Sequence, residues 1–368
     1  MAARPATRRP PGRPADTVNR PIVRDLSRGG TPYRIDWDVR PAYDFVFSLS
    51  SDAGSTDDLP ATDRRWLTDS LASLEAEDRS SIRQLFENEL CIQVAAMLVD
   101  RPEVRTSADF VAAIESSSPA DVIAPAFLDG HHDAALGDLV RQALAGDTKV
   151  LEELEERLPD WNRQGRMAVL RDPRHTYERI VDGLRAWQTR FAEIEPRVTA
   201  ILERDYDSRA ADRETLVPVD LIERTTGGIR WLPEPGVRRV ILGPSYFSRP
   251  YNFLMAAGDW RFFGYPVGDE ALDESDALTA PQSVVRLHRA LGDSTRLKIL
   301  KLLASRDLYL TEIAQQLDLS KPTIKHHLAQ LRSAGLVTIT ESGTVMYYSL
   351  RRNRLDDASA EIKRFLIG

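Results

Sequence analysis

The amino-acid sequence predicts a mainly α-helical protein with small antiparallel β-structure, which places it in the α+β class. Apolar residues recur at helical spacing across most of residues 61–211. Short β-rich runs bounded by Gly and Pro concentrate later, within residues 216–267 and 336–350. The sign of the charge also changes along the chain, so we expect separate parts with separate roles.

The chain has 368 residues, enough for about two or three domains. Its net charge of −7 is unevenly distributed, with +5 in residues 1–30, −18 in 31–281 and +6 in 282–368. A basic carboxy-terminal part behind an acidic body predicts that only the former meets nucleic-acid phosphates. No apolar run approaches the ~18 residues needed to span a bilayer, and the amino end lacks a signal-peptide core. We therefore expect a cytoplasmic protein with no membrane partner.

Residues 1–30 are rich in Arg and Pro and hold almost no large apolar side chains. They cannot bury enough surface to offset their ordering entropy, so we expect a disordered basic tail. A passive tail or an over-long gene start is the favoured interpretation, and a basic arm along DNA is the alternative. The single cysteine, Cys91, excludes an intramolecular disulfide, and its apolar surroundings predict a buried, unreactive thiol.

Residues 31–267 predict a sensor or regulatory domain that is helical over most of its length. Tyr33–Trp37 has the composition of a short strand. Pro159, Pro173 and Pro196 are predicted helix boundaries, and we interpret the Trp and Met residues of the apolar stripes as core. The stripes are Ile82, Leu85, Phe86, Leu90, Val94 and Met97; Phe110, Val111 and Ile114; and Tyr177, Ile180, Val181, Leu184, Trp187 and Phe191.

A small aromatic-rich sheet is predicted at about residues 216–267, where nine aromatic side chains fall between Trp231 and Tyr265. One interpretation is a sheet packed on the helices; the other is a pocket for a small-molecule effector. The candidate pocket residues are Trp231, Tyr246, Phe253 and Phe262. Two hairpins are predicted, 228–232 with 237–242 about Pro233–Gly236, and 252–255 with 260–265 about Gly258–Asp259. Residues 268–281 (GDEALDESDALTAP) predict an acidic interdomain linker.

Residues 310–335 (LTEIAQQLDLSKPTIKHHLAQLRSAG) predict two amphipathic helices around a tight turn at Asp318–Ser320. Thr311 is the predicted N-cap of the first helix, and Ser320 that of the second. Asp293 is the predicted N-cap of a preceding helix that buries Leu297, Leu300 and Leu303. Two helices joined by such a turn form a helix-turn-helix, which presents its second helix to the DNA major groove.

The faces of these helices separate the side chains that pack from those that meet DNA. At 100° per residue, the inward side of the second helix is expected to anchor it, and the outward side to read the groove. The predicted packing residues are Ile313, Ala314, Leu317, Ile324, His327, Leu328 and Leu331. The predicted DNA contacts are Lys321, Pro322, Thr323, Lys325, His326, Gln330 and Arg332.

Two further elements follow this unit. Leu336–Thr340 and Val345–Leu350 predict a β-hairpin, which makes the unit a winged helix with no Lys or Arg at the wing tip. Arg351 at the hairpin's end is a further predicted phosphate contact. An amphipathic terminal helix with no sequence-local cover predicts a dimerisation element. Its apolar residues are Leu355, Ala358, Ile362 and Phe365.

The motifs ALGDSTRLKILKLL, LTEIAQQLDLSKPTIKHHLAQLRSAGLV and VMYYSL resemble the ArsR-type (arsenic-repressor) winged-helix regulators over about residues 282–366. The resemblance implies a homodimer that reads a partly palindromic operator in double-stranded DNA. It implies dimerisation through the first helix, which contains Leu287, and the last. The segments YRIDW, AYDFVFSL and GVRRVILGPSYF are similar to the amino-terminal domain of a subgroup of these regulators, for which no defined activity follows.

Metal-sensing members of that family carry a cysteine pair before the turn, or Asp/His and His/Glu pairs on the terminal helix. Here the first region reads YLTEIAQQL, and the terminal helix holds Asp356, Asp357 and Glu361 without histidine. We therefore expect neither a metal site nor a cofactor.

We predict a DNA-binding transcriptional regulator, a homodimeric repressor controlled by a non-metal ligand or partner of the amino-terminal domain. An enzyme with an appended regulatory winged helix is the alternative, since DGHHD at residues 129–133 superficially resembles a metal-ligand cluster. The GxGxxG, P-loop, HExxH and GxSxG motifs are absent from the sequence. A winged helix that binds only protein is a third hypothesis, which the +6 charge of the module disfavours.

Overall fold

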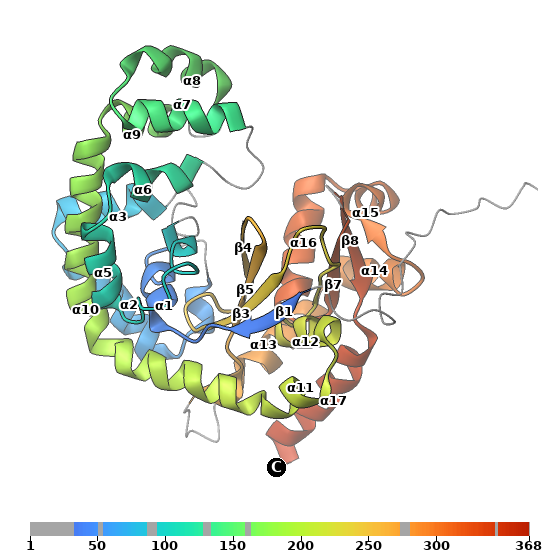
Figure 1. Cartoon of the computed structure of the whole chain (residues 1–368). Helices are drawn as coiled ribbons and strands as arrows, with labels where there is room; N and C mark the ends of the chain where they lie inside the picture. The colour runs from blue at the N-terminus through green and yellow to red at the C-terminus, as the bar shows by residue number, and fades with distance from the viewer. Residues whose placement is uncertain are drawn as a thin grey trace, which may run out of the picture. The chain divides into compact units, whose positions relative to one another are not determined.

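The computed structural model describes residues 33–50, 54–86, 94–127, 134–158, 163–272, 280–342 and 345–367. The predictions for the basic tail, Cys91 and the DGHHD loop fall outside these residues, as does half of the acidic linker. From Tyr33 onward the chain forms one compact unit, which is mainly helical and holds two small four-stranded sheets (Figure 1). Among the described helices, none is long and apolar enough to cross a membrane.

Residues 33–272, called the regulatory region after the role expected from the sequence, are built on the 36-residue helix α10 (Pro173–Ser208), the long helix of Figure 1. This helix buries an apolar stripe, as its sequence predicted, and the indole N–H of Trp187 donates to Ser48 Oγ at 2.9 Å. The other helices of the region are α1 (Pro41–Phe47), α2 (Ala61–Ser73), α3 (Ala76–Phe86), α5 (Ser107–Glu115), α6 (Pro119–Ile123), α7 (Ala134–Leu144), α8 (Leu151–Arg157), α9 (Arg163–Arg171), α11 (Ala210–Thr215) and α12 (Pro218–Thr225).

The predicted boundary at Pro173 is confirmed, because this residue lies in the first turn of α10, where a missing N–H is harmless. The predicted boundary at Pro196 is wrong, because α10 continues through it to Ser208. Phe191 and Val198 are fully buried on either side of that proline. Tertiary packing of the apolar stripe therefore outweighs the lost hydrogen bond.

The first sheet has the strand order β1-β3-β5-β4, with β1 (Arg34–Trp37), β3 (Arg239–Ser245), β4 (Phe253–Ala257) and β5 (Trp260–Pro266). The β4–β5 hairpin is antiparallel, as predicted, whereas β1, β3 and β5 are mutually parallel. The predicted hairpin of residues 228–242 is wrong, and the sheet is mixed rather than antiparallel. Burial explains the difference: β3 is covered on both faces, as central parallel strands are.

The carboxy-terminal module, residues 282–367, holds the predicted helix-turn-helix and an antiparallel wing. Its own apolar core includes Leu287, Ile313 and Leu328. Its elements are α13 (Gln282–Leu291), α14 (Ser294–Leu303), β6 (Leu308–Tyr309), α15 (Leu310–Leu317), α16 (Lys321–Ser333), β7 (Val337–Ser342), β8 (Val345–Leu350) and α17 (Arg352–Ile367).

The predicted cap at Asp293 is confirmed, since its carboxylate accepts the Arg296 backbone N–H at 2.8 Å. The predicted cap at Thr311 is wrong. The cap is Tyr309, two residues earlier, and its N–H donates to Glu312 at 3.1 Å. Leu297, predicted to be buried, is 48% exposed.

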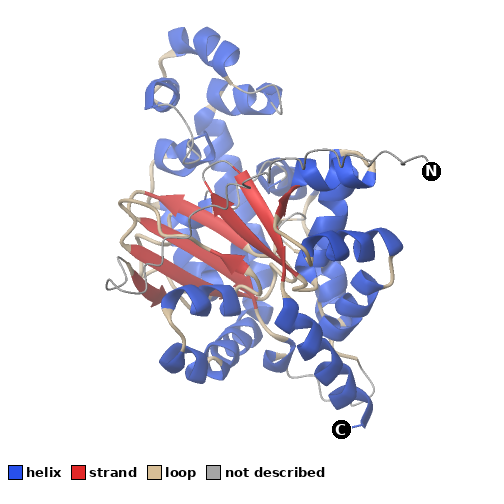
Figure 2. Cartoon of the chain, turned by 90° about the vertical axis from the view of Figure 1, so that its right-hand side faces the viewer, coloured by secondary structure: helices blue, strands red, loops and turns tan. Residues whose placement is uncertain are grey.

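The second sheet has the order β2-β7-β8-β6 and combines two distant parts of the chain. Strand β2 (Ile229–Arg230) belongs to the regulatory region and pairs in parallel with β7 of the wing. Figure 2 shows the strands of the molecule in red. The regulatory region and the module therefore share a sheet.

We predict that Trp187→Ala destabilises the protein by ~3–5 kcal/mol, because it opens a cavity and leaves Ser48 without its donor. Val217→Ala is the control, since Val217 is 60% exposed, and it should change the free energy of unfolding by no more than about 0.5 kcal/mol. Urea unfolding of the full chain measures both. A loss below about 1 kcal/mol for Trp187→Ala would contradict the assignment of α10 as the centre of the core.

Candidate nucleic-acid interface

The turn between α15 and α16 takes its shape from two polar residues. Asp318 adopts the left-handed conformation (φ 52°, ψ 48°) that ends α15, and it is the one non-glycine residue with positive φ among the described residues. Ser320 then caps α16, its Oγ accepting the Thr323 N–H at 3.2 Å. Asp tolerates this backbone better than most residues, so the local sequence sets the angle between the two helices.

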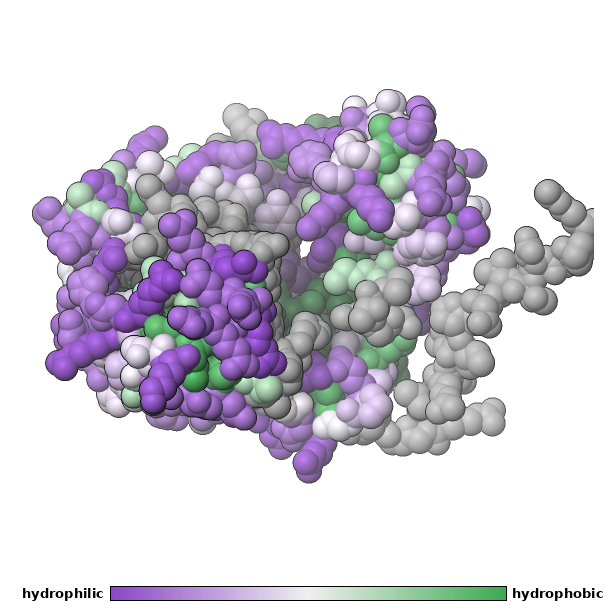
Figure 3. All heavy atoms as spheres, turned by 90° about the horizontal axis from the view of Figure 1, so that it is seen from above, coloured by the Kyte–Doolittle hydropathy of each residue, from purple (hydrophilic) through white to green (hydrophobic). Residues whose placement is uncertain are grey.

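The outward face of α16 presents basic and polar side chains to solvent. Lys321, Pro322, Thr323, Lys325 and His326 are all exposed. Arg332 is exposed as well, whereas Gln330 is half-buried. Figure 3, which views the molecule from above Figure 1, shows a mostly hydrophilic face among the coloured residues. The exposed cations offer the charge that phosphates attract.

The inward face packs on the module's core. Ile313, Ala314, Ile324, Leu328 and Leu331 are buried, and Leu317 is half-buried against the same cluster.

The two adjacent histidines differ in exposure, as predicted. The side chain of His327 is 15% exposed, and its Nδ1 lies 3.8 Å from Asp293 Oδ1, whereas His326 is exposed. The Nδ1 of His327 is buried without a hydrogen-bond partner among the described residues. The pKa of Asp293 is lowered, mainly because it accepts the Arg296 N–H and more weakly because His327 is near.

Arg351, the further predicted phosphate contact, lies between β8 and α17. It is half-buried beside Gly335, and its Nε is buried without a hydrogen-bond partner among the described residues. Burial lowers its pKa, and the charge of Glu223 on α12 partly opposes that effect. Arg351 therefore lies near enough to the regulatory region to feel the charge of Glu223, and its role as a phosphate contact stays a prediction.

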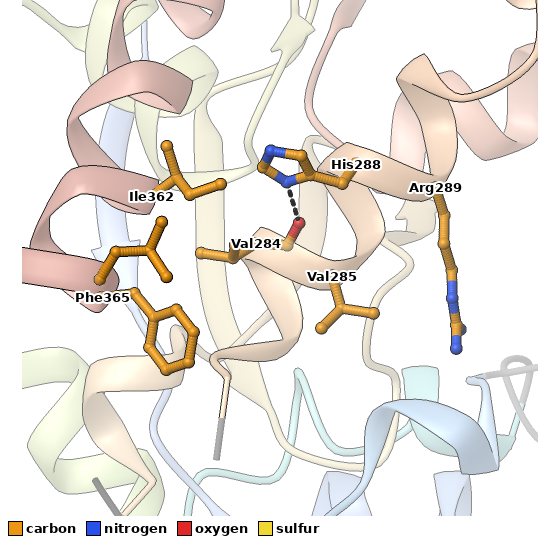
Figure 4. A pocket seen from close by; sticks show the side chains of 7 residues that line it. Val284, Val285, His288, Arg289, Ile362 and Phe365 are labelled. Atoms are coloured by element: carbon orange, nitrogen blue, oxygen red, sulfur yellow. Dashed lines mark hydrogen bonds between the residues drawn. The ribbon is translucent and has the colours of Figure 1, made fainter. Parts of the chain in front are cut away.

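The predicted dimerisation residues divide into two groups. Leu287 and Ala358 are buried in the module's own core, so they do not form an outer surface. Leu355 is 40% exposed and Leu366 is 69% exposed. Ile362, Phe365 and Leu366 instead line an open groove of about 470 Å³ between α13 and α17 (Figure 4). The remaining lining residues are Val284, Val285, His288 and Arg289.

The four predicted pocket residues do not surround one cavity. Trp231 packs with Tyr33 and Phe263 in one apolar cluster, whereas Phe253 and Phe262 belong to another. Tyr246 joins the second cluster, and all four side chains are buried. The reason is strand alternation, because neighbours such as Phe262 and Phe263 point to opposite faces of a sheet. Within the described residues these aromatics are core.

Sequence reasoning missed a buried ion cluster that joins the regulatory region to α13. Arg286 of α13 pairs with Asp58, and Arg249 pairs with Asp269 and lies 3.3 Å from Asp58. The Ser283 N–H donates to Asp269 at 2.7 Å. Burial raises the pKa of Asp269, but the charges of Arg249 and Arg286 outweigh that effect and hold it below its usual value. The first part of the predicted linker therefore contributes to an ordered junction.

Carboxylates of α17 face solvent or an arginine. Asp356 and Asp357 are exposed, and Glu361 pairs with Arg354 at 2.6 Å. Over the described ranges, no three His, Cys, Asp or Glu side chains gather in a way that could hold a metal ion.

Comparison with known proteins places this geometry among bacterial regulators. Residues 293–338 match the family model described as "Bacterial regulatory protein, arsR family". The transcriptional repressor SdpR of Bacillus subtilis is 40% identical over 70 residues, which cover 19% of this chain and 78% of SdpR. The arsenical resistance operon repressor of Staphylococcus aureus is 36% identical over 69 residues, covering 19% and 66%.

The transcriptional regulator KmtR of Mycobacterium tuberculosis is 38% identical over 72 residues, covering 20% of this chain, so the match spans only about half (55%) of KmtR. The solved structure of HlyU from Vibrio cholerae is 28% identical, and the alignment covers 24% of this chain and 95% of HlyU with a TM-score of 0.20.

We predict that Arg286→Met destabilises the protein by ~2–3 kcal/mol, because Asp58 keeps only Arg249 as a partner in a buried site. Arg289→Met is the matched control on the same helix, where the side chain is exposed, and should cost no more than about 0.5 kcal/mol. Equal losses in urea unfolding would contradict the role of the cluster. The double variant Asp58→Asn/Arg286→Met should be less destabilised than the sum of its parts.

Proposed function

Because this chain belongs to the ArsR family of bacterial regulatory proteins, we propose that it is a sequence-specific, homodimeric transcriptional repressor controlled through its regulatory region. The observation that carries the proposal is the exposed basic and polar face of α16, held by a packed inner face and a capped turn. Two relatives bear the word repressor in their names, which supports the sign of regulation. The site of action would be the cytoplasm, where bacterial chromosomes lie.

Phosphate attraction and base reading would be divided between different side chains. Lys321 lies in the first turn of α16, where its charge adds to the positive end of the helix dipole. Lys325 and His326 lie one turn further on the outward face and would reach base edges or phosphates. Each good bidentate contact with a base discriminates by ~1–3 kcal/mol. The affinity for DNA would therefore depend on the salt concentration, and the preference for particular base sequences would depend on the side chains of α16.

The groove between α13 and α17 supports a homodimer. Its lining is apolar except for His288 and Arg289, and the Nδ1 of His288 is already bonded to Val284 O at 2.8 Å (Figure 4). Leu366 remains 69% exposed beside it. A second copy would cover this surface, and two copies would present two α16 helices to a partly palindromic operator.

The residues of the module support the proposal of control by a non-metal ligand or partner. Helix α15 carries no cysteine, and Glu361 of α17 is engaged by Arg354. The regulatory region contacts the module both at α13 and at the wing, so a molecule bound to that region would act directly on the DNA-binding module.

We predict that Lys325→Ala weakens binding to a duplex from the protein's own promoter region about tenfold, or ~1.4 kcal/mol, by removing one charged contact from each copy of the proposed dimer. Lys149→Ala, which removes an exposed lysine of the regulatory region, should leave affinity unchanged. Fluorescence anisotropy at several salt concentrations measures both. Equal affinities for the two variants would show that the outward face of α16 has been assigned wrongly.

We predict that Leu366→Asp weakens the homodimer at least tenfold, because a charge replaces an apolar side chain beside the α13–α17 groove. Val217→Asp introduces the same charge at a site that is 60% exposed and should leave assembly unchanged. Sedimentation velocity over a range of protein concentrations measures the equilibrium. A wild-type protein that stays monomeric at every concentration would contradict the homodimer.

A further inference from the structure

Strand β2 adds a piece of the regulatory region to the edge of the wing. Ile229 pairs with Ile339 and Arg230 with Thr340, in parallel register. The Ile339 N–H donates to the Gly228 carbonyl at 2.9 Å, so main-chain bonding connects the two segments. The sheet of the wing thus consists of β6, β7 and β8 from the module and of β2 from a distant part of the chain.

The segment that carries β2 is anchored firmly in its own region. Gly227 and Gly228 have φ values of +69° and +132°, which few other residues adopt, and they bring the chain close to Val337. Thr226 Oγ1 accepts the Ile229 N–H at 3.0 Å. Just after β2, Trp231 is 4% exposed and packs edge-on against Tyr33.

Asn252, from the loop between β3 and β4, donates through Nδ2 to the Thr226 carbonyl at 2.9 Å. The strand is therefore held by the regulatory sheet on one side and by the wing on the other. A side chain on β2 has a defined position relative to the wing.

Arg230 is the exposed side chain of this strand. It lies at the register of Thr340, two residues before β7 ends at Ser342, which corresponds to about 7 Å along a strand. None of the described residues forms a hydrogen bond or an ion pair with its guanidinium. The exposed Arg238 of the same region, by contrast, pairs with Asp259 at 3.4 Å.

The wing has no positive charge of its own to offer. Residues 337–350 (VTITESGTVMYYSL) contain one Glu and no Lys or Arg. A wing that approaches the DNA backbone without a cation gains little from the phosphates, because their attraction for Lys and Arg dominates affinity. Arg230 stands beside this hairpin with its charge unused.

We propose that Arg230 is a DNA phosphate contact, supplied to the wing by the regulatory region through β2. This inference rests on the proposed DNA-binding function. The interface then extends beyond the segment that matches the family, and a displacement of the regulatory region removes a contact from the DNA.

The test compares Arg230→Gln with Arg238→Gln in the full chain. Both variants remove one exposed arginine from the same region, so they change the net charge equally. Affinity for a duplex from the protein's own promoter region is measured between about 50 mM and 200 mM salt. Each copy of the proposed dimer contributes one Arg230, so Arg230→Gln should lower the salt slope by about 1.8. Its loss relative to wild type should then grow about twelvefold toward low salt. Arg238→Gln should match wild type.

Hydrogen exchange of the Ile339 amide checks that β2 stays paired in Arg230→Gln, and its protection should be unchanged. If Arg230→Gln binds like wild type while Lys325→Ala loses affinity, Arg230 is no contact and the DNA-binding function stands. If wild type shows no salt-dependent DNA binding, the proposed function fails and Arg230 loses its role with it.

Discussion

The position of the wing in the carboxy-terminal module depends on the main-chain pairing of β2 with β7. Within the module, the hairpin of β7 and β8 is extended only on its β8 side, by the two-residue strand β6, so β7 is the outer strand. That strand would leave N–H and C=O groups free at an exposed edge. Strand β2 covers that edge, and the Gly228 carbonyl takes up the Ile339 N–H. The wing's position is consequently set by the regulatory region as well as by the module's own core.

A second connection between the regulatory region and the module lies at the start of α13. The cluster of Asp58, Arg249, Asp269 and Arg286 ties the start of α13 to the regulatory region, and α13 also lines the groove proposed for the dimer. Charges buried in this way are costly unless every partner is present. A ligand that shifts the regulatory region would therefore act on the wing and on α13 at once, without a separate signal through α16.

The helices of the carboxy-terminal module could be predicted well from the sequence because the residues that specify them are close together in the chain. Asp318, Ser320 and Pro322 define a turn within a few residues, and the apolar periodicity of α16 separates its faces. Strand β2 has two residues and no periodic pattern, so its pairing with β7 had no local sign. The contact between Asp58 and Arg286 joins residues 228 positions apart. The half-burial of Arg351 had no local sign either, and Glu223, whose charge acts on its pKa, comes from α12.

The regulatory region shows the same division between local and long-range information. The apolar stripes of its helices could be predicted from residue spacing. The positions of its aromatic side chains could not, because they depend on the strand register, and a shift of one position moves a side chain to the opposite face of the sheet. The four residues of the predicted pocket consequently lie in two different apolar clusters. At Pro196 the local signal was misleading. The apolar stripe continues on both sides of this proline, and α10 continues with it.

The central claim is that the regulatory region and the reader form one DNA-binding unit. Hydrogen exchange of the full chain, with and without a duplex from its own promoter region, tests this most directly. The account predicts that the duplex slows exchange in α16 and, together with it, at the paired amides of β2 and β7. Protection of α16 with unchanged exchange in β2 and β7 would contradict the claim.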